Sequence, residues 1–189
     1  RYVGLAFFDE DTWEHSPKRI ENLFGSEFEY HEKGTPWLRP VTDDPETFAS
    51  VLDTVEHVDL ETWSLPEPYR EEWEHRKRAG RKLPQLGGGS RGPATVMTSI
   101  LTPETAFFWI YDHPQLMRRF RDLLADKMAA FNKVLRDFSG NDEDGWSITD
   151  DNCALFTPDM YAEYCAPVLE HVFAELAPGP APRAPHSDS

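Results

Sequence analysis

The sequence predicts an α/β fold in which parallel strands alternate with helices, as in about the first five βα units of a (β/α)₈ TIM barrel. Three observations lead to this prediction. Short apolar segments that end in polar residues alternate with segments of helical periodicity, and several helices begin with a recognisable cap. The chain has 189 residues, whereas a complete barrel typically takes about 250. We therefore expect a single domain over 1–189 that forms part of a barrel.

The part of the chain before the glycine-rich segment is expected to contain one strand and three helices. The strand covers 2–8 and runs into a cluster of acids. Ser16 and Asp44 are each followed by proline, which marks them as N-caps of the first two helices. The third helix, within 66–82, is highly charged, and its acids precede its bases as the helix dipole favours. It shows few apolar positions, so it is also a candidate contact surface.

The second part of the chain continues the alternation of strands and helices. A short strand is expected over 82–86, before a glycine-rich loop. The strongest helical pattern follows over 114–138, where apolar residues recur every three or four positions and form one buried stripe. A strand is expected at 144–148, followed over 157–176 by a helix that Thr157 caps and that breaks before Pro167. A last short strand is expected to end near the C-terminus of the sequence.

Charge and cysteine content narrow the classes of partner. The 34 acidic and 19 basic residues give a formal net charge of −15, which disfavours nucleic acid and anionic membranes as partners. Cys153 and Cys165 have no metal-type spacing and are too few for a disulfide scaffold. The sequence shows no signal peptide and no run long enough to cross a membrane. We expect a cytoplasmic protein that acts on a small molecule.

Two adjacent acids, Asp150 and Asp151, follow the strand at 144–148. In parallel α/β sheets the functional groups gather at the carboxyl ends of strands. We therefore treat both as candidate catalytic residues. Consecutive side chains point in different directions, so one aspartate is expected to face the site while the other holds the loop by accepting hydrogen bonds from backbone amides. The alternative is that both only cap or solvate the turn.

Other polar residues follow further strands in the same way. Asp9 or Asp11 follows the first strand, unless these acids form only an exposed turn, and His186 and Asp188 end the last strand. Because their positions differ by two, His186 and Asp188 share a face, which suits a metal site or a proton relay. The glycine-rich "GGGSRGP" lacks the ending of a phosphate-binding loop. Its glycines instead allow a substrate to approach the backbone, with Arg91 as an anion clamp.

Several stretches together resemble the uroporphyrinogen decarboxylase superfamily, which also contains zinc-dependent, corrinoid-linked methyltransferases. The similarity is clearest in "GPATVMTSILTPETAFFWIYDHPQLMRRFRDLLADKMAAF" and continues through "GWSITDDNCALFTPDMYAEYCAPVLEHVF" to "HSDS". It covers roughly 92–189, whereas 1–91 is divergent. The resemblance implies a TIM barrel with its active site at the strand ends.

The chain departs from that family pattern at several positions. The arginine-rich N-terminal motif of the decarboxylases is absent, and Ser99 stands where they have a tyrosine. Their E-S-H stretch is replaced by Asp150, Asp151 and Asn152. The methyltransferases hold zinc with an H-x-C motif, which reads here as histidine, serine and Asp188, so a bound metal would have harder ligands. The residues we assign to substrate binding are Asp9, Arg91, Ser99, Trp146 and Asn152.

Three functions are compatible with the sequence. The leading hypothesis is methyl transfer or related chemistry on a small polar substrate, with His186 and Asp188 as zinc ligands and a corrinoid carried by a partner protein. The alternative is decarboxylation of uroporphyrinogen or a related porphyrinogen, in which an aspartate stabilises the developing positive charge. The third hypothesis is non-catalytic: the chain is a barrel subunit that binds a corrinoid protein. A partial barrel would leave sheet edges uncovered, so we also expect further chain or an oligomer such as a homodimer to cover them.

Overall fold

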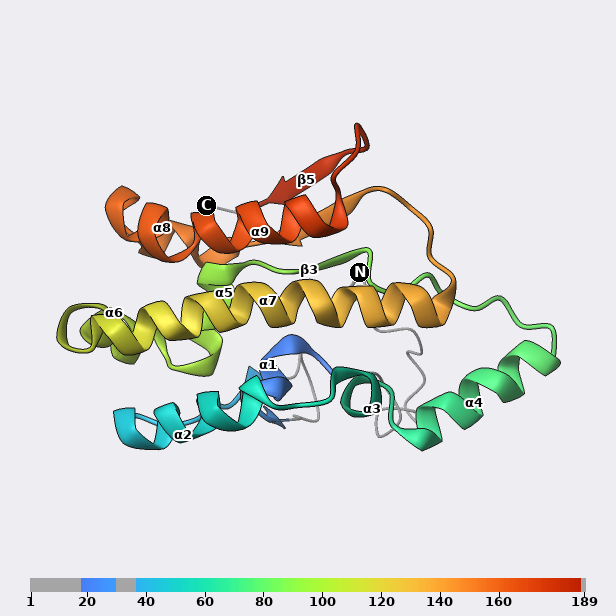
Figure 1. Cartoon of the computed structure of the whole chain (residues 1–189), viewed down its shortest axis with the longest axis horizontal. Helices are drawn as coiled ribbons and strands as arrows, with labels where there is room; N and C mark the ends of the chain where they lie inside the picture. The colour runs from blue at the N-terminus through green and yellow to red at the C-terminus, as the bar shows by residue number, and fades with distance from the viewer. Residues whose placement is uncertain (1–17, 30–36, 188–189) are drawn as a thin grey trace.

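The computed structural model describes residues 18–29 and 37–187 (Figure 1). Before the parallel sheet come α1 (Ile20–Leu23), β1 (Phe28–Glu29), β2 (Trp37–Leu38), α2 (Pro45–Glu56), α3 (Leu60–Ser64) and α4 (Glu67–Arg78). The remaining elements are β3 (Gly89–Arg91), α5 (Pro93–Ile100), α6 (Pro103–Asp112), α7 (Pro114–Ser139), β4 (Trp146–Thr149), the 3₁₀ helix η2 (Asp151–Leu155), α8 (Pro158–Tyr164), α9 (Ala166–Leu176) and β5 (Arg183–His186).

The predicted parallel sheet is present as three strands in the order β3-β4-β5. Helices α5 to α7 connect β3 to β4, and η2, α8 and α9 connect β4 to β5, so the chain makes two successive βαβ units. Strands β1 and β2 form a separate antiparallel pair. The described residues thus form a mixed α/β fold with a three-stranded parallel sheet rather than the predicted run of about five parallel strands. The strand expected at 2–8 lies outside the described residues.

The prediction of a strand at 82–86 is wrong, because the observed strand lies in the glycine-rich segment that follows. Residues 82–86 have no regular structure, and β3 begins at Gly89. A Cβ atom at Gly89 would lie 2.4 Å from the hydroxyl oxygen of Ser147 in β4. Glycine is therefore what lets the two strands pair this closely.

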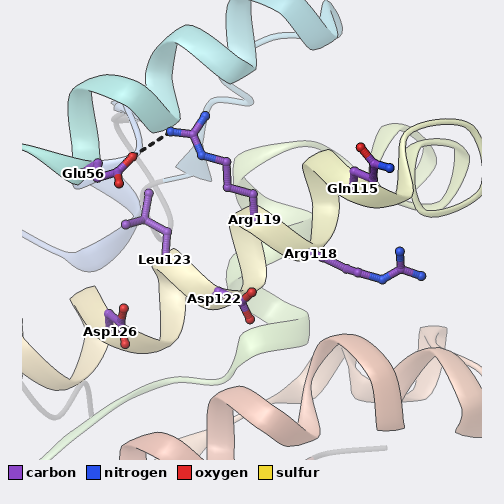
Figure 2. Close-up of a pocket in the computed structure, with 7 residues that line it drawn as sticks. All are labelled: Glu56, Gln115, Arg118, Arg119, Asp122, Leu123 and Asp126. Atoms are coloured by element: carbon purple, nitrogen blue, oxygen red, sulfur yellow. Dashed lines mark hydrogen bonds and ion pairs between the residues drawn. The ribbon is translucent and has the colours of Figure 1, made fainter.

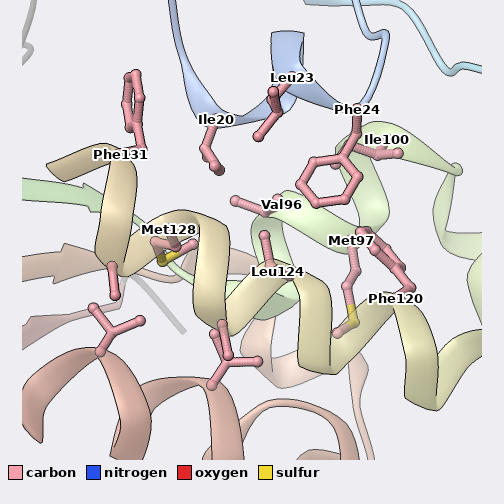
Figure 3. Packing of buried hydrophobic residues seen from close by; sticks show 14 of the residues in the cluster. Ile20, Leu23, Phe24, Val96, Met97, Ile100, Phe120, Leu124, Met128 and Phe131 are labelled. Atoms are coloured by element: carbon pink, nitrogen blue, oxygen red, sulfur yellow. The ribbon is translucent and has the colours of Figure 1, made fainter. Parts of the chain in front are cut away.

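Helix α7 forms the centre of the core. Helices α2 and α3 pack on one side of it and α9 on the other (Figure 1). Figure 3 shows Phe120, Leu124 and Met128 of α7 against apolar side chains from α1 and α5. The predicted helix at 114–138 is confirmed almost to the residue, and it ends where Gly140 adopts a left-handed conformation with φ of 66°.

The expected caps and the helix break are also found where the structure describes them. The Asp44 side chain accepts a 2.8 Å hydrogen bond from the amide of Thr47 at the start of α2. The Thr157 hydroxyl oxygen accepts from the amide of Met160 in α8. Helix α8 ends and α9 begins around Cys165, just before Pro167. The helix start expected after Ser16 is wrong, because Lys18 and Arg19 are not helical and Arg19 is the N-cap of α1. Ser16 itself lies outside the described residues.

Helix α4 was predicted to be a charged helix with few apolar positions, and the few that it has are buried. Tyr69 is fully buried, and Trp73 is 4% exposed. Both rings pack against Phe138 at the end of α7. These two residues lie four positions apart, a narrow apolar stripe among charged neighbours that the sequence pattern underestimated. Among the described helices, none combines the length and the apolar character needed to cross a membrane.

Candidate active site at the carboxyl edge of the sheet

The carboxyl ends of the three parallel strands bring several of the candidate residues into one row. Arg91 at the end of β3 is in register with Thr149 of β4, which is in register with His186 of β5. Neighbouring strands lie about 4.8 Å apart, so the three residues span about 10 Å. Asp150 and Asp151 follow Thr149 directly. This edge is the arrangement expected for an active site in a parallel α/β sheet.

Asp150 is buried and fully engaged by surrounding groups. Its side chain is 5% exposed. One carboxylate oxygen accepts a 2.8 Å hydrogen bond from the amide of Thr95, and the other accepts a 3.3 Å bond from the hydroxyl of Tyr161. Its backbone amide donates to the carbonyl oxygen of His186 at 2.9 Å. Asp150 therefore joins β4 to β5, to α5 and to α8.

The position of Asp150 depends on Gly92, the residue that precedes α5. Gly92 is the N-cap of α5 and has no side chain with which to cap the helix. A Cβ atom there would lie 2.3 Å from both Cβ and Cγ of Asp150. The glycine thus makes room for a carboxylate from β4, which caps α5 in its place and complements the positive end of the helix dipole.

Asp151 and Asn152 begin η2 and have different environments. Asp151 is exposed at the edge. Asn152 donates from its side chain to the hydroxyl oxygen of Thr98 at 2.8 Å, and its backbone amide donates to the hydroxyl oxygen of Thr95 at 3.2 Å. Asn152 therefore holds η2 against α5. Ser99 is half-buried on the same helix.

Arg91 is held by a buried acid that was not among the candidate residues predicted from the sequence. One guanidinium nitrogen of Arg91 lies 2.9 Å from the carboxylate of Glu21 in α1. The Glu21 side chain is 2% exposed, whereas that of Arg91 is 34% exposed. A buried carboxylate needs such a partner. The ion pair fixes the orientation of Arg91 and offsets its charge, which weakens its expected role as an anion clamp.

Tyr161 is a second residue of the site that was not among the candidates predicted from the sequence. Burial raises the pKa of its hydroxyl, and the nearby negative charge of Asp150 raises it further. The hydroxyl is therefore a hydrogen-bond donor to Asp150 across the neutral pH range. The sequence predicts that Tyr161 lies on a helix. Its hydrogen-bond partner, Asp150, becomes evident only from the packing of α8 against the end of β4.

The residues proposed as metal ligands are only partly described. His186 is exposed at the end of β5, and Asp188 lies outside the described residues, as does Asp9. The Cys153 sulfur lies 3.3 Å from the hydroxyl oxygen of Ser187, so η2 approaches the end of β5. Within 18–29 and 37–187 no three His, Cys, Asp or Glu residues are grouped to hold a metal ion.

Trp146 is the one candidate in the sheet that lies away from this edge. It starts β4, in register with Arg183 at the opposite end of the sheet. It is 1% exposed and packs edge-on against Phe173 of α9, with ring centroids 5.4 Å apart. Its position is that of a core residue between the sheet and α9.

A shallow hollow of about 440 Å³ lies elsewhere, on the outer side of α7 (Figure 2). Arg119 in this hollow contacts Asp53 at 2.7 Å and Glu56 at 2.8 Å. Arg118 contacts Glu163 at 2.8 Å. Because its cations are already paired with acids of the chain, the hollow offers less to a ligand than the strand ends do.

Comparison with known protein families gives a match that covers the parallel sheet and its carboxyl edge. The sequence profile of the family described as "Uroporphyrinogen decarboxylase (URO-D)" matches residues 20–186, which is most of the chain and includes all three parallel strands. No curated protein matches the sequence significantly. The family is described by the name of an enzyme, and the match extends over every described residue of the carboxyl edge except Ser187. The chain belongs to the uroporphyrinogen decarboxylase (URO-D) family.

Proposed function

We propose that the chain catalyses methyl transfer, or related chemistry, on a small polar substrate bound at the carboxyl edge of the sheet. The observation that supports this proposal most is the row formed by Arg91, Thr149 and His186, with Asp151 beside it. Residues with different side-chain chemistry thus lie in register at the ends of three adjacent strands. The acidic character of the chain, with a net charge of −15, favours a substrate that is not a polyanion.

The two aspartates have separate roles in this proposal. Asp150 is committed to the amide of Thr95 and the hydroxyl of Tyr161, so it holds the edge together. Asp151 is exposed and is the carboxylate that exchanges a proton with the substrate. His186, at the end of the adjacent strand, acts as a proton relay.

Zinc is the cofactor that the methyltransferase branch implies, and the described residues do not provide a site for it on their own. His186 is present at the edge, but no set of three ligands forms among the described side chains. Asp188 is outside them. We therefore assign the proton transfers to Asp151 and His186 and derive no step that passes through a metal. A corrinoid bound to a partner protein remains part of the proposal as the methyl donor.

The test compares two edge variants with a matched control. Asp151→Asn and His186→Gln keep the size of each side chain but remove its acid-base chemistry. Each is expected to lower turnover about 100-fold or more, as is typical for the loss of a general acid or base. Asp159→Asn, an exposed acid in α8, is expected to leave turnover unchanged. Methyl transfer from methylcobalamin to a thiol is the assay, and full activity in both edge variants rejects the proposal.

Decarboxylation of a porphyrinogen is the second candidate. Asp150 and Asp151 place two carboxylates at the edge, and a carboxylate stabilises positive charge that develops on pyrrole nitrogens. The polycarboxylate substrate is a poor electrostatic match for a chain at −15. Porphyrin binding discriminates the two candidates, since a ligand that binds the native state raises its thermal stability. Protection by uroporphyrin or coproporphyrin, with no methyl transfer, would favour the decarboxylase.

A non-catalytic role belongs to a different class of function. In that case the chain would be a barrel subunit that docks a corrinoid protein or a second copy of itself, and the edge acids would serve only as surface. Strand β5 supports this possibility, because its residues are exposed along its whole described length. Partner binding that is unaffected by Asp151→Asn, in a protein with no turnover, would favour this role.

A further inference from the structure

The C-terminal end of α4 and the turn after it carry a cluster of bases in an otherwise acidic chain. We define the basic tip as Lys77, Arg78, Arg81 and Lys82, all of which are exposed. No acidic residue occurs in 75–82, although the whole chain has 34 acids and 19 bases. The tip is thus a local reversal of the charge of the molecule.

The bases of the tip differ from other described bases in how little they contact within the chain. Elsewhere, Arg119 binds two acids, and Lys18 lies over the ring of Trp63. In contrast, Arg81 and Lys82 make no hydrogen bond or ion pair through their side chains with any residue that the structure describes.

The other two bases of the tip have weak internal contacts. Lys77 is 4.0 Å from the carboxylate of Glu74, at the limit of an ion pair. Arg78 uses its Nε to donate to the Glu74 carbonyl oxygen at 3.2 Å, which leaves its terminal nitrogens to solvent. An exposed pair such as Lys77–Glu74 contributes little to stability. The tip therefore presents four cationic groups that have weak contacts or none with acidic groups of the described fold.

Position in the fold makes the tip accessible without obstructing the carboxyl edge. Tyr69 and Trp73 fasten the body of α4 to Phe138. Beyond them the helix extends away from α7, and its end lies on the opposite side of the molecule from α6 and α8 (Figure 1). The chain leaves the helix at Ala79 and turns through Gly80, which has φ of 67°.

The bases near the helix end also complement its dipole, and this is the simplest explanation for Lys77 and Arg78. It does not account equally for Arg81 and Lys82, which follow the C-cap residue Ala79. The dipole effect falls off within the last turn. The described fold therefore offers Arg81 and Lys82 no charged partner, although the chain as a whole has a net charge of −15.

We infer that the basic tip docks a short acidic segment of a partner protein. Carboxylates match the geometry of arginine, which binds them with two parallel hydrogen bonds. A short segment contacts the tip alone, whereas a nucleic acid duplex or a membrane would extend over the acidic remainder of the molecule and be repelled. Within 75–82 there is no Phe, Tyr or Trp ring on which bases of a single strand would stack, and no apolar side chain larger than that of Ala79 to enter a bilayer. This inference is independent of the reaction at the carboxyl edge.

The experiment measures binding of a fluorescein-labelled hexaglutamate peptide to the full chain by fluorescence anisotropy. The wild-type chain is expected to bind the peptide, and added salt is expected to weaken binding because the contact is electrostatic. The variant Arg81→Gln/Lys82→Gln is expected to bind about tenfold more weakly, since two exposed charge contacts are lost. The control Arg118→Gln/Lys133→Gln removes the same charge from α7 and is expected to change the affinity by less than about twofold.

Several outcomes would overturn the inference. Equal weakening in the tip variant and the control would show that only net charge matters. Tighter binding of decathymidylate, or of vesicles that contain phosphatidylserine, would assign the tip to nucleic acid or to a membrane instead. Self-association that the tip variant abolishes would assign it to a second copy of the chain. A fall in the thermal unfolding midpoint of the tip variant alone would show that the bases serve the end of α4.

Discussion

Asp150 and Asp151 are adjacent in the sequence but face different surroundings. The sequence placed both after a strand and predicted that one would hold the loop while the other faced the site. It could not say which, because the choice depends on the amide of Thr95 and the hydroxyl of Tyr161. Those groups belong to α5 and α8, whose packing against the end of β4 is a tertiary property. Asp150 is the buried aspartate, and its hydrogen bonds join the loop to α5 and α8.

Replacement of each aspartate by alanine is expected to separate their contributions to stability. Asp150→Ala removes the cap of α5 and leaves a half-buried tyrosine hydroxyl without its acceptor, so we expect a loss of about 2 kcal/mol in the free energy of unfolding. Asp151→Ala changes an exposed side chain and is expected to cost less than about 0.5 kcal/mol. Urea denaturation monitored by circular dichroism measures both values, and equal losses would contradict the assignment.

At the scale of elements, the sequence predicted well wherever local signals decide the structure. Asp44 and Thr157 marked helix starts, and the apolar stripe marked α7, because caps and periodicity act within a few residues. The strand expected at 82–86 failed, because β3 is specified by contact with β4. Glycine has little strand propensity, so nothing local identified Gly89 as the start of a strand.

At Gly92 the start of α5 lies directly against the side chain of Asp150. Gly92→Ala would force its Cβ into the side chain of Asp150, so we expect a loss of about 2 to 3 kcal/mol in the free energy of unfolding. The matched control is Gly88→Ala, where the nearest atom is the Asn141 side-chain nitrogen at 3.8 Å. That variant is expected to change stability by about 0.5 kcal/mol or less. Unfolding midpoints in urea measure the difference, and an equally stable Gly92→Ala would show that Asp150 is not held against this loop.

Arg136 connects three elements at the opposite end of the sheet. Its guanidinium donates to the carbonyl oxygens of Gly87, Gly145 and Leu176, which precede β3, precede β4 and end α9. Burial lowers its pKa, yet it stays charged at neutral pH because arginine starts so high. Arg136→Met is expected to cost about 3 kcal/mol, because three carbonyl groups lose their donor.

The control for Arg136 is another arginine of the same helix. Arg118→Met removes an exposed ion pair with Glu163 and is expected to cost less than about 1 kcal/mol. Thermal and urea unfolding of both variants provide the comparison. If the two variants lost similar free energies of unfolding, the three hydrogen bonds of Arg136 would not be what holds the sheet to α7 and α9.

At the scale of the whole molecule, several buried groups are expected to lower the free energy of unfolding as the pH becomes alkaline. Burial raises the pKa values of Tyr69, Tyr161 and Cys165. Each of these groups is neutral when protonated, so the native state retains the proton more strongly than the unfolded chain does. Their contribution is complete below the unfolded pKa, about 8.5 for cysteine and about 10 for tyrosine. It is lost as pH rises from that value through the raised native pKa.

Tyr69 provides the sharpest test of this alkaline loss, because it is fully buried and packs between α4 and α7. In the wild-type chain, each such tyrosine contributes a slope of about −1.4 kcal/mol per pH unit to the free energy of unfolding above its unfolded pKa. Tyr69→Phe keeps the ring and removes the ionisable hydroxyl, so the slope above pH about 10 is expected to become shallower by that amount. Tyr111→Phe, at a side chain 73% exposed, is expected to leave the slope unchanged. Urea unfolding over a pH series from about 8 to about 11 measures both slopes. A wild-type slope in Tyr69→Phe would mean that α4 opens before the tyrosine ionises, and that the joint between α4 and α7 is weaker than its packing implies.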